Sequence, residues 1–334
     1  MNGRGLQLGS IRGIPLRVDH SWFIVFVLIT MSLSTHFASQ HPKWTSAEHY
    51  LFGIMTSLLF FSSVVLHELG HSVIGQNYGI AVKSITLFVF GGVAQIAREP
   101  ERPVQEFNIA IAGPTVSAAV GAGFYGLSVW LPSAFEGIVA QAQWLGRINL
   151  TLAVFNLIPG FPLDGGRVLR AVIWGFTGSF QRATAAATGA GHAVAYIFIM
   201  IGIAIGLTGN FVGGLWIAFI GWFLLNAAQS TAAQAKLKFA LAGIKAGDVM
   251  TKDYLRIPRG ISIAELVESF LLKHGVRCCM VLDGDRFSGL VTLPDIKKCR
   301  AAIGRPLRCK PLWCERTVFS ASPRVPIFGP CCNS

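Results

Sequence analysis

Apolar residues fill six long runs of the chain, and short polar stretches separate them. Each run approaches or exceeds the roughly 20 residues that an α-helix needs to cross a bilayer. The six runs are residues 21–38, 50–74, 108–131, 137–160, 184–207 and 211–234. The pattern predicts an α-helical polytopic membrane protein with a six-helix transmembrane core.

Residues 80–97, IAVKSITLFVFGGVAQIA, depart from this pattern. They are rich in β-branched and aromatic side chains and contain the pair Gly91 and Gly92. Such a run with internal glycines is typical of a β-hairpin. Backbone groups outside a helix at membrane depth must be covered by protein or line a wet cavity. We predict a membrane-associated β-hairpin, and a hairpin on the cytoplasmic surface is the alternative.

Composition and charge support a membrane protein. Of the 334 residues, 52% are hydrophobic and 13% are charged, whereas an ordinary soluble domain carries about 25% charged residues. The net charge of +12 would fit a nucleic-acid-binding protein, but the Lys and Arg residues lie mostly between the apolar runs and in the C-terminal part. In membrane proteins such residues mark the cytoplasmic side. We expect both termini in the cytoplasm and no nucleic-acid partner.

The composition changes near residue 243. Strand-like and helix-like runs alternate from there, with the charge content of a small soluble α/β unit. Residues after about 299 hold five of the seven cysteines and show neither a helical nor a strand period. We divide the chain into a membrane domain (1–240), a small cytoplasmic α/β domain (243–300) and an atypical tail (301–334), interpreted as disordered or frame-shifted.

Three ionisable residues lie inside the second apolar run. His67, Glu68 and His71 form the pattern H-E-x-x-H. Positions i and i+4 share one face of a helix, so both imidazoles can reach one metal ion, as in zinc metalloproteases. An acidic side chain at the centre of a membrane helix costs roughly 3 kcal/mol. A purely structural role, as hydrated residues at a helix end, is therefore the weaker interpretation.

A zinc site of this kind needs a third protein ligand. Asp164 is the only acidic residue between Glu136 and Asp248, and the charge pattern places it on the same membrane side as His71. Pro159 and Pro162 interrupt the helix before it, and a broken helix at membrane depth suits a wet catalytic cavity. The alternative to a ligand is that PLDGGR (162–167) forms an ordinary turn at the membrane interface, with Asp164 as a helix cap.

The segments HELGH (67–71) and FNLIPGFPLDGGR (155–167) resemble the two signatures of the site-2 protease family of intramembrane zinc metalloproteases, and the resemblance extends over residues 14–235. It implies that His67, His71 and Asp164 bind one Zn²⁺ per chain and that Glu68 activates the water. It further implies that Asn156 stabilises the oxyanion and that Gly91 and Gly92 belong to the loop that receives substrate as an extended strand.

The same resemblance implies a location and a class of substrate. The family cuts within or near transmembrane segments, so the expected partners are the lipid bilayer and a single-span membrane protein, such as an anti-sigma factor or a membrane-bound transcription-factor precursor. With the charge pattern, it places the chain in the cytoplasmic membrane. A membrane metal-ion transporter and an inactive scaffold are the competing functions. The clustering of ionisable groups on one membrane side favours the enzyme over the transporter.

Residues 243–300 resemble a single CBS motif, a module found at the C-terminus of one bacterial and archaeal branch of the family. Pairs of such motifs usually bind adenine nucleotides. Because only one copy is legible here, nucleotide binding would need a partner copy, and a homodimer through this region would supply one. A passive assembly module is the alternative.

Overall fold

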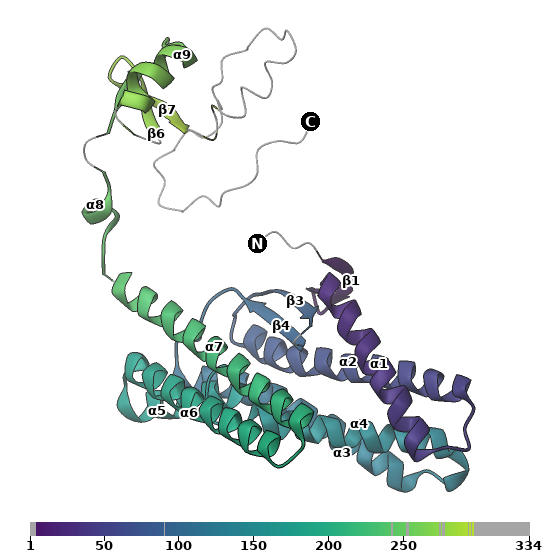
Figure 1. Cartoon of the computed structure of the whole chain (residues 1–334). Coiled ribbons are helices and arrows are strands. Elements are labelled where there is room, and N and C mark those ends of the chain that lie inside the picture. The colour runs from purple at the N-terminus through teal and green to yellow at the C-terminus, as the bar shows by residue number, and fades with distance from the viewer. Residues whose placement is uncertain are drawn as a thin grey trace, which may run out of the picture. The chain divides into compact units, whose positions relative to one another are not determined.

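The computed structural model describes residues 5–89, 91–241, 243–251, 254–273, 275, 278–292, 294 and 296. The chain separates into two compact units, residues 1–242 and residues 243–334 (Figure 1). The first unit contains the long helices and a four-stranded sheet, and the second contains a three-stranded sheet with short helices.

Within the described residues, the first unit contains seven helices longer than ten residues. They are α1 (His20–Gln40), α2 (Ser46–Asn77), α3 (Pro103–Trp130), α4 (Glu136–Asn156), α5 (Asp164–Thr177), α6 (Phe180–Leu207) and α7 (Phe211–Leu241), with the 3₁₀ turn η1 (Ser133–Phe135) before α4. Local signals set several ends. Thr45 and Glu48 form a capping box at the start of α2, Pro103 occupies the first turn of α3, and Gly178 ends α5 in a left-handed conformation.

Five of the described helices are long and apolar enough to cross a membrane: α1, α2, α3, α6 and α7. The chain is therefore a multi-pass membrane protein. The sixth predicted span is not confirmed. Residues 136–156 form α4, but its side chains include Gln141, Arg147 and Asn149. Gln141 and Asn149 are buried, and Gln141 donates to the carbonyl of Phe52 at 3.2 Å, so this helix is adapted to protein neighbours.

The predicted hairpin forms as the strands β3 (Val82–Phe88) and β4 (Gly91–Ile96), which pair antiparallel. It is half of a larger sheet, because β1 (Leu6–Ile11) and β2 (Ile14–Val18) extend it in the order β1-β2-β3-β4. Strand β2 runs parallel to β3, which leaves β4 at an edge. Its place relative to the membrane remains a prediction.

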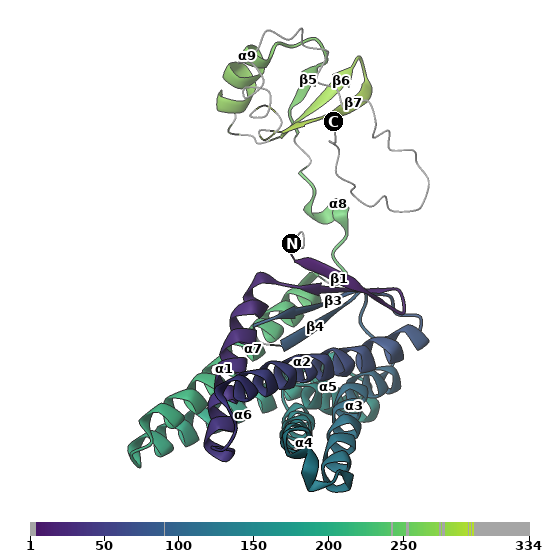
Figure 2. The ribbon, with the colours of Figure 1, turned by 90° about the vertical axis from the view of Figure 1, so that its right-hand side faces the viewer.

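The sheet packs on α2 (Figure 2). Buried Val18 and Leu87 of the sheet contact Val64 and Val65 of the helix. These two valines lie within one helical turn before the H-E-x-x-H motif, so the same contact that buries the sheet brings β4 beside the polar residues of α2.

The second unit is built on a sheet of the order β5-β6-β7, with β5–β6 parallel and β6–β7 antiparallel. Its elements are α8 (Ala246–Val249), β5 (Arg256–Pro258), α9 (Ile263–Glu265), the π-helical segment η2 (Leu266–Leu272), β6 (Cys278–Asp283) and β7 (Arg286–Thr292). Ile257, Leu266 and Val281 form its core with Leu271 and Cys279. The tail expected at 301–334 lies outside the described residues.

Candidate active site

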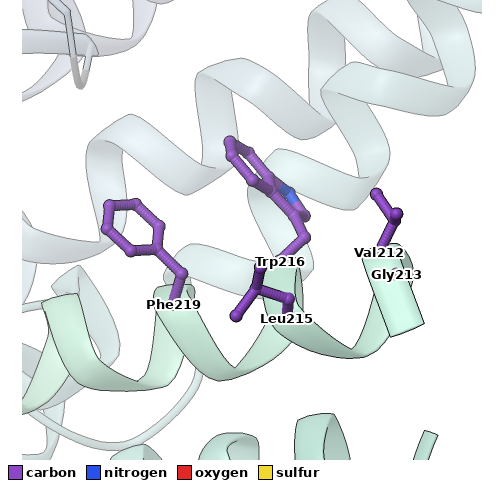
Figure 3. A pocket seen from close by; sticks show the side chains of 5 residues that line it. All are labelled: Val212, Gly213, Leu215, Trp216 and Phe219. Carbon is purple, nitrogen blue, oxygen red and sulfur yellow. The ribbon is translucent and has the colours of Figure 1, made fainter. Parts of the chain in front are cut away.

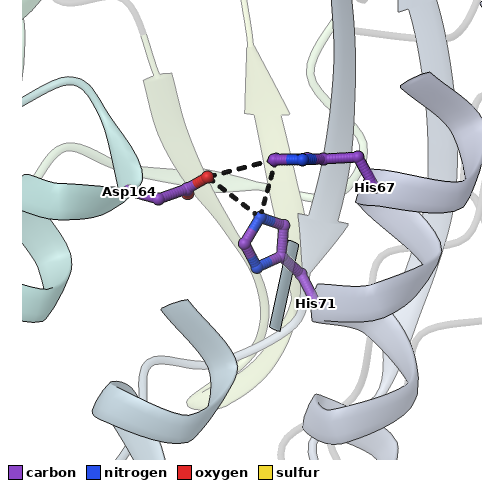
Figure 4. Close-up of side chains that lie close together, drawn as sticks. All are labelled: His67, His71 and Asp164. Carbon is purple, nitrogen blue, oxygen red and sulfur yellow. Dashed lines mark hydrogen bonds and ion pairs between the residues drawn. The ribbon is translucent and has the colours of Figure 1, made fainter. Parts of the chain in front are cut away.

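Three side chains from two helices converge in the first unit (Figure 4). His67 and His71 project from α2, and Asp164 is the first residue of α5. Oδ2 of Asp164 lies 3.1 Å from Nε2 of His67 and 3.2 Å from Nε2 of His71. The two Nε2 atoms are 3.2 Å apart. The three ligand atoms that the sequence predicts therefore meet at one point.

The spacing of these atoms fits a zinc ion. Ligand atoms about 2.0–2.1 Å from a tetrahedral Zn²⁺ lie about 3.3 Å from one another, close to the three separations observed. Two imidazoles and a carboxylate are also the donor set of a catalytic zinc site, in which the fourth position stays open. The cluster has the ligands and the dimensions for one Zn²⁺.

Each histidine is oriented through its second nitrogen by α3. Nδ1 of His71 donates to the carbonyl of Ile109 at 2.6 Å, and Nδ1 of His67 lies 2.8 Å from Oγ of Ser117. A proton on Nδ1 leaves the lone pair of Nε2 free for a metal. Such outer partners fix the ring orientation and raise the basicity of the ligand. Both imidazoles thus present the nitrogen that faces Asp164.

A glycine of α3 provides the space for the two imidazoles. A Cβ atom at Gly113 would overlap Nε2 of His71 and would lie 2.7 Å from Nε2 of His67. No residue with a side chain fits this position while the two rings keep their places. Gly113 therefore forms the wall of the site on the side of α3.

Asp164 reaches the site because the chain folds back tightly before α5. A Cβ atom at Gly165 would overlap the carbonyl oxygens of Leu157 and Ile158, and one at Gly166 would overlap the backbone of Gly160. The tight turn therefore places Oδ2 of Asp164 within 3.2 Å of both Nε2 atoms, where it can serve as the third ligand of the same metal ion.

Glu68 lies beside the cluster and faces β4. Its Oε2 accepts a hydrogen bond from the backbone N–H of Ala94 at 3.2 Å. A Cβ atom at Gly92 would lie 2.6 Å from Cγ of Glu68, so β4 passes close to this side chain because residue 92 is a glycine. The glutamate is in direct contact with the edge strand of the sheet.

Comparison with known proteins supplies the family. A model of peptidase family M50 matches residues 55–133 and 127–203. The protein sll0528 of Synechocystis sp., provisionally named a zinc metalloprotease, is 38% identical over 297 residues, which cover 87% of this chain and 77% of that protein. The chain belongs to peptidase family M50. Its resemblance to the site-2 proteases is thereby confirmed, and its classification as a zinc metalloprotease follows.

The chain is also similar to two proteins of one archaeon. Zinc metalloprotease MJ0392 of Methanocaldococcus jannaschii is 31% identical over 293 residues, covering 88% of this chain and 79% of that protein. A solved structure, the site-2 protease from the same organism, covers 68% of this chain and 94% of its own, at 30% identity and a TM-score of 0.47. A CBS-domain model matches residues 246–302, which confirms the CBS resemblance of the second unit.

The hydrogen bonds recorded at the metal cluster involve neither Asn156 nor Gly91, two of the predicted site residues of the M50 chain. Asn156 is the half-buried last residue of α4, and its side chain makes no hydrogen bond within the described part of the chain. Gly91 begins β4 opposite Phe88, with a φ of 123° that favours glycine. The role of Asn156 in catalysis and the role of Gly91 in receiving the substrate remain predictions.

Sequence reasoning missed the contribution of α3. Ile109, Gly113 and Ser117 recur at helical spacing and are buried, and this stripe of small and apolar residues is visible in the sequence. The stripe alone does not reveal which helix it contacts, because small residues are common wherever membrane helices pack.

A hollow on α7 has an apolar lining, unlike the metal cluster. It has a volume of about 630 Å³ and is lined by Val212, Gly213, Leu215, Trp216 and Phe219 (Figure 3). The lining residues offer neither a metal ligand nor an acid–base group, so this hollow is separate from the metal cluster of α2 and α5.

Proposed function

We propose that the protein is an intramembrane zinc metalloprotease that hydrolyses peptide bonds in or near transmembrane segments of membrane-bound regulatory proteins. The observation that carries this proposal is the position of the metal cluster. Two of its three ligands belong to α2, a helix long and apolar enough to cross a membrane. A hydrolytic site on such a helix can reach peptide bonds at membrane depth.

The residues of the site divide the chemistry among them. His67, His71 and Asp164 would hold Zn²⁺, which when bound polarises the scissile carbonyl and activates a water molecule. Glu68 takes the proton of the attacking water and returns it to the leaving amine. Asn156 donates a hydrogen bond to the oxyanion.

The edge of β4 receives the substrate in this proposal. An extended peptide can add to an exposed sheet edge through main-chain hydrogen bonds. The Ala94 amide points away from β3 toward Glu68, as their 3.2 Å hydrogen bond records. A substrate strand that pairs there replaces Glu68 at this amide, so the peptide arrives beside the catalytic base and releases it.

The decisive experiment compares three full-length proteins purified in detergent: wild type, Glu68→Gln and Asp164→Asn. Each is assayed for bound zinc and for cleavage of a panel of single-span membrane substrates. Loss of a general base lowers the rate by about 10²–10⁴-fold, so we expect Glu68→Gln to keep zinc and lose cleavage. Asp164→Asn should lose both, because an amide is a weaker ligand than a carboxylate.

Glu48→Gln is the matched control, since it makes the same change at the other end of α2 and a glutamine can keep the capping box. Cleavage by Glu68→Gln at the rate of the control would overturn the proposed mechanism. Zinc binding without cleavage, together with zinc flux into vesicles containing the wild type, would identify a transporter instead.

Strand addition has its own test. Ala94→Pro removes the outward amide of β4, and we expect cleavage to fall while the zinc content stays at the wild-type value. Ser10→Pro is the control, because it places a proline in β1, the opposite edge of the same sheet. Unchanged cleavage by Ala94→Pro would exclude pairing at this amide.

We further propose that both termini face the cytoplasm and that the second unit forms a homodimer whose paired CBS motifs bind an adenine nucleotide. The CBS match to residues 246–302 covers one motif, and a second copy of the chain would complete the pair. Titration of the full-length protein with ATP and AMP tests nucleotide binding, and crosslinking measures the dimer content. Nucleotide binding by a monomer, or dimers without binding, would refute the combined proposal.

A further inference from the structure

A buried ion pair joins α3 to α5 near the metal cluster. Glu106 of α3 is fully buried, and Arg170 of α5 is 8% exposed. Nε of Arg170 donates to Oε1 of Glu106 at 2.8 Å, and Nη2 donates to the same oxygen. Glutamate and arginine are almost never buried to this degree without a partner, so each depends on the other for its position.

The guanidinium of Arg170 also contacts two aromatic rings. Its carbon Cζ lies 4.9 Å from the ring centre of Phe161 and 4.6 Å from that of Phe180, within the range of cation–π attraction. Phe161 belongs to the turn that precedes Asp164, and Phe180 begins α6. One side chain thus holds the turn before Asp164, the start of α6 and the first turn of α3.

Both ends of the pair are linked to the metal ligands. Arg170 lies on the helix that begins with Asp164. Glu106 lies three residues before Ile109, whose carbonyl accepts from His71, and positions i and i+3 share a face of the helix. The pair therefore connects the helix that carries the third ligand to the helix that orients the first two.

Stability alone is a weak reason for a charged pair in this place. Replacement of a buried ion pair by apolar residues of similar volume is often neutral or stabilising. Arg170 donates from two N–H groups to one carboxylate oxygen, Oε1, so its planar guanidinium fixes the direction of the contact as well as supplying attraction. A role that depends on the relative orientation of α3 and α5 would explain the charged pair better than stability does.

We propose that Glu106 and Arg170 are positioning residues that set the distance of Asp164 from His67 and His71, and thereby the affinity of the site for its metal ion. Neither residue touches the metal. The inference rests on the proposed metal site and adds to it the contact that aligns its two halves.

The test uses the full chain in detergent and measures Zn²⁺ affinity by chelator competition. The key variant is the double substitution Glu106→Leu with Arg170→Met, which leaves no unpaired buried charge. We expect it to fold, as checked by thermal unfolding, and to bind Zn²⁺ about 10–100-fold more weakly, the usual cost of losing an outer-shell contact. In the metal-free protein, amides in the first turn of α5 should exchange hydrogen faster than in wild type.

The matched control is the same double change in the surface pair Arg98–Glu101, whose side chains are 56% and 71% exposed. It should bind Zn²⁺ as the wild type does. Wild-type affinity in the folded Glu106/Arg170 variant, or an equal loss in the control, would overturn the positioning role and leave the metal site in place. A wild-type protein that does not bind Zn²⁺ would overturn both.

Discussion

Two helix contacts in the membrane unit use glycine for opposite purposes. Between α6 and α7, a Cβ atom at Gly202 would overlap the backbone nitrogen of Ala218, and one at Gly214 would overlap that of Gly206. Glycine there lets two backbones touch, as is common between membrane helices. Between α2 and α3, Gly113 instead leaves room for the two imidazoles of the metal cluster.

The hydrogen bonds of the buried polar side chains also differ between the two regions. At the α2–α3 contact, His67 pairs with Ser117 and His71 donates to the carbonyl of Ile109, both across the two helices. In α6 the buried Thr184 and Thr188 bond to carbonyls of their own helix. The α6–α7 contact, where backbones touch, should tolerate a change of polarity but not a larger side chain. The α2–α3 contact, which surrounds the metal ligands, should tolerate neither change.

Gly113→Val is the change with the largest expected effect. Its side chain would occupy the position of the two Nε2 atoms, so we expect zinc binding and cleavage to fall below detection. Zinc content per protein, measured after purification, is the readout. A folded variant that kept its zinc would abolish the distinction between the two contacts.

Gly92→Ala is expected to have the next largest effect. The new methyl group forces Glu68 to move, and a misplacement of about 1 Å can cost about 10²-fold in rate. Cleavage should fall by that order, and the affinity for zinc should stay near the wild-type value. A parallel loss of zinc would show that the strand supports the ligands and not only the base.

Ser117→Ala should have a smaller effect. It removes the partner of His67 Nδ1, and such losses weaken metal affinity by about 10–100-fold. Chelator competition measures the change, and Ser128→Ala is the control, because Ser128 bonds only to a carbonyl of its own helix α3. Equal affinities in the two variants would contradict the assigned contact.

Gly214→Leu should affect the metal site least. Overpacking of a close contact costs about 1–3 kcal/mol of stability, so the unfolding temperature should fall. Zinc affinity of the folded protein should not change, because α7 supplies no ligand. A matching loss of affinity would mean that the two contacts are energetically coupled.

Much of the fold was predictable, and the misses have physical causes. Long apolar runs identified five spans, whereas the run at 137–160 contains Gln141, Arg147 and Asn149, and its role as a sixth span stays a prediction. Strands β1 and β2 were missed although LQLGS and IPLRV flank the Arg12-Gly13 turn. The pairing of β2 with β3 joins segments more than 60 residues apart, and no local pattern reveals such a partner.

The residues of the candidate site were likewise predicted only where a local pattern indicates them. The spacing of H-E-x-x-H placed two ligands on one helix face, and the scarcity of acidic residues singled out Asp164. Ser117, Ile109 and Gly113 escaped because their roles depend on which face of α3 meets α2. The Glu106–Arg170 pair escaped for the same reason, since its partners lie 64 residues apart.

The space at Gly113 also bears on how related chains are interpreted. A single codon change there would remove the chemistry and leave every ligand, the base and both signature motifs intact. Such a chain would be a pseudoenzyme that a motif search counts as active. An inventory of working members of the family should therefore require the glycine of α3 as well as the residues that bind and activate.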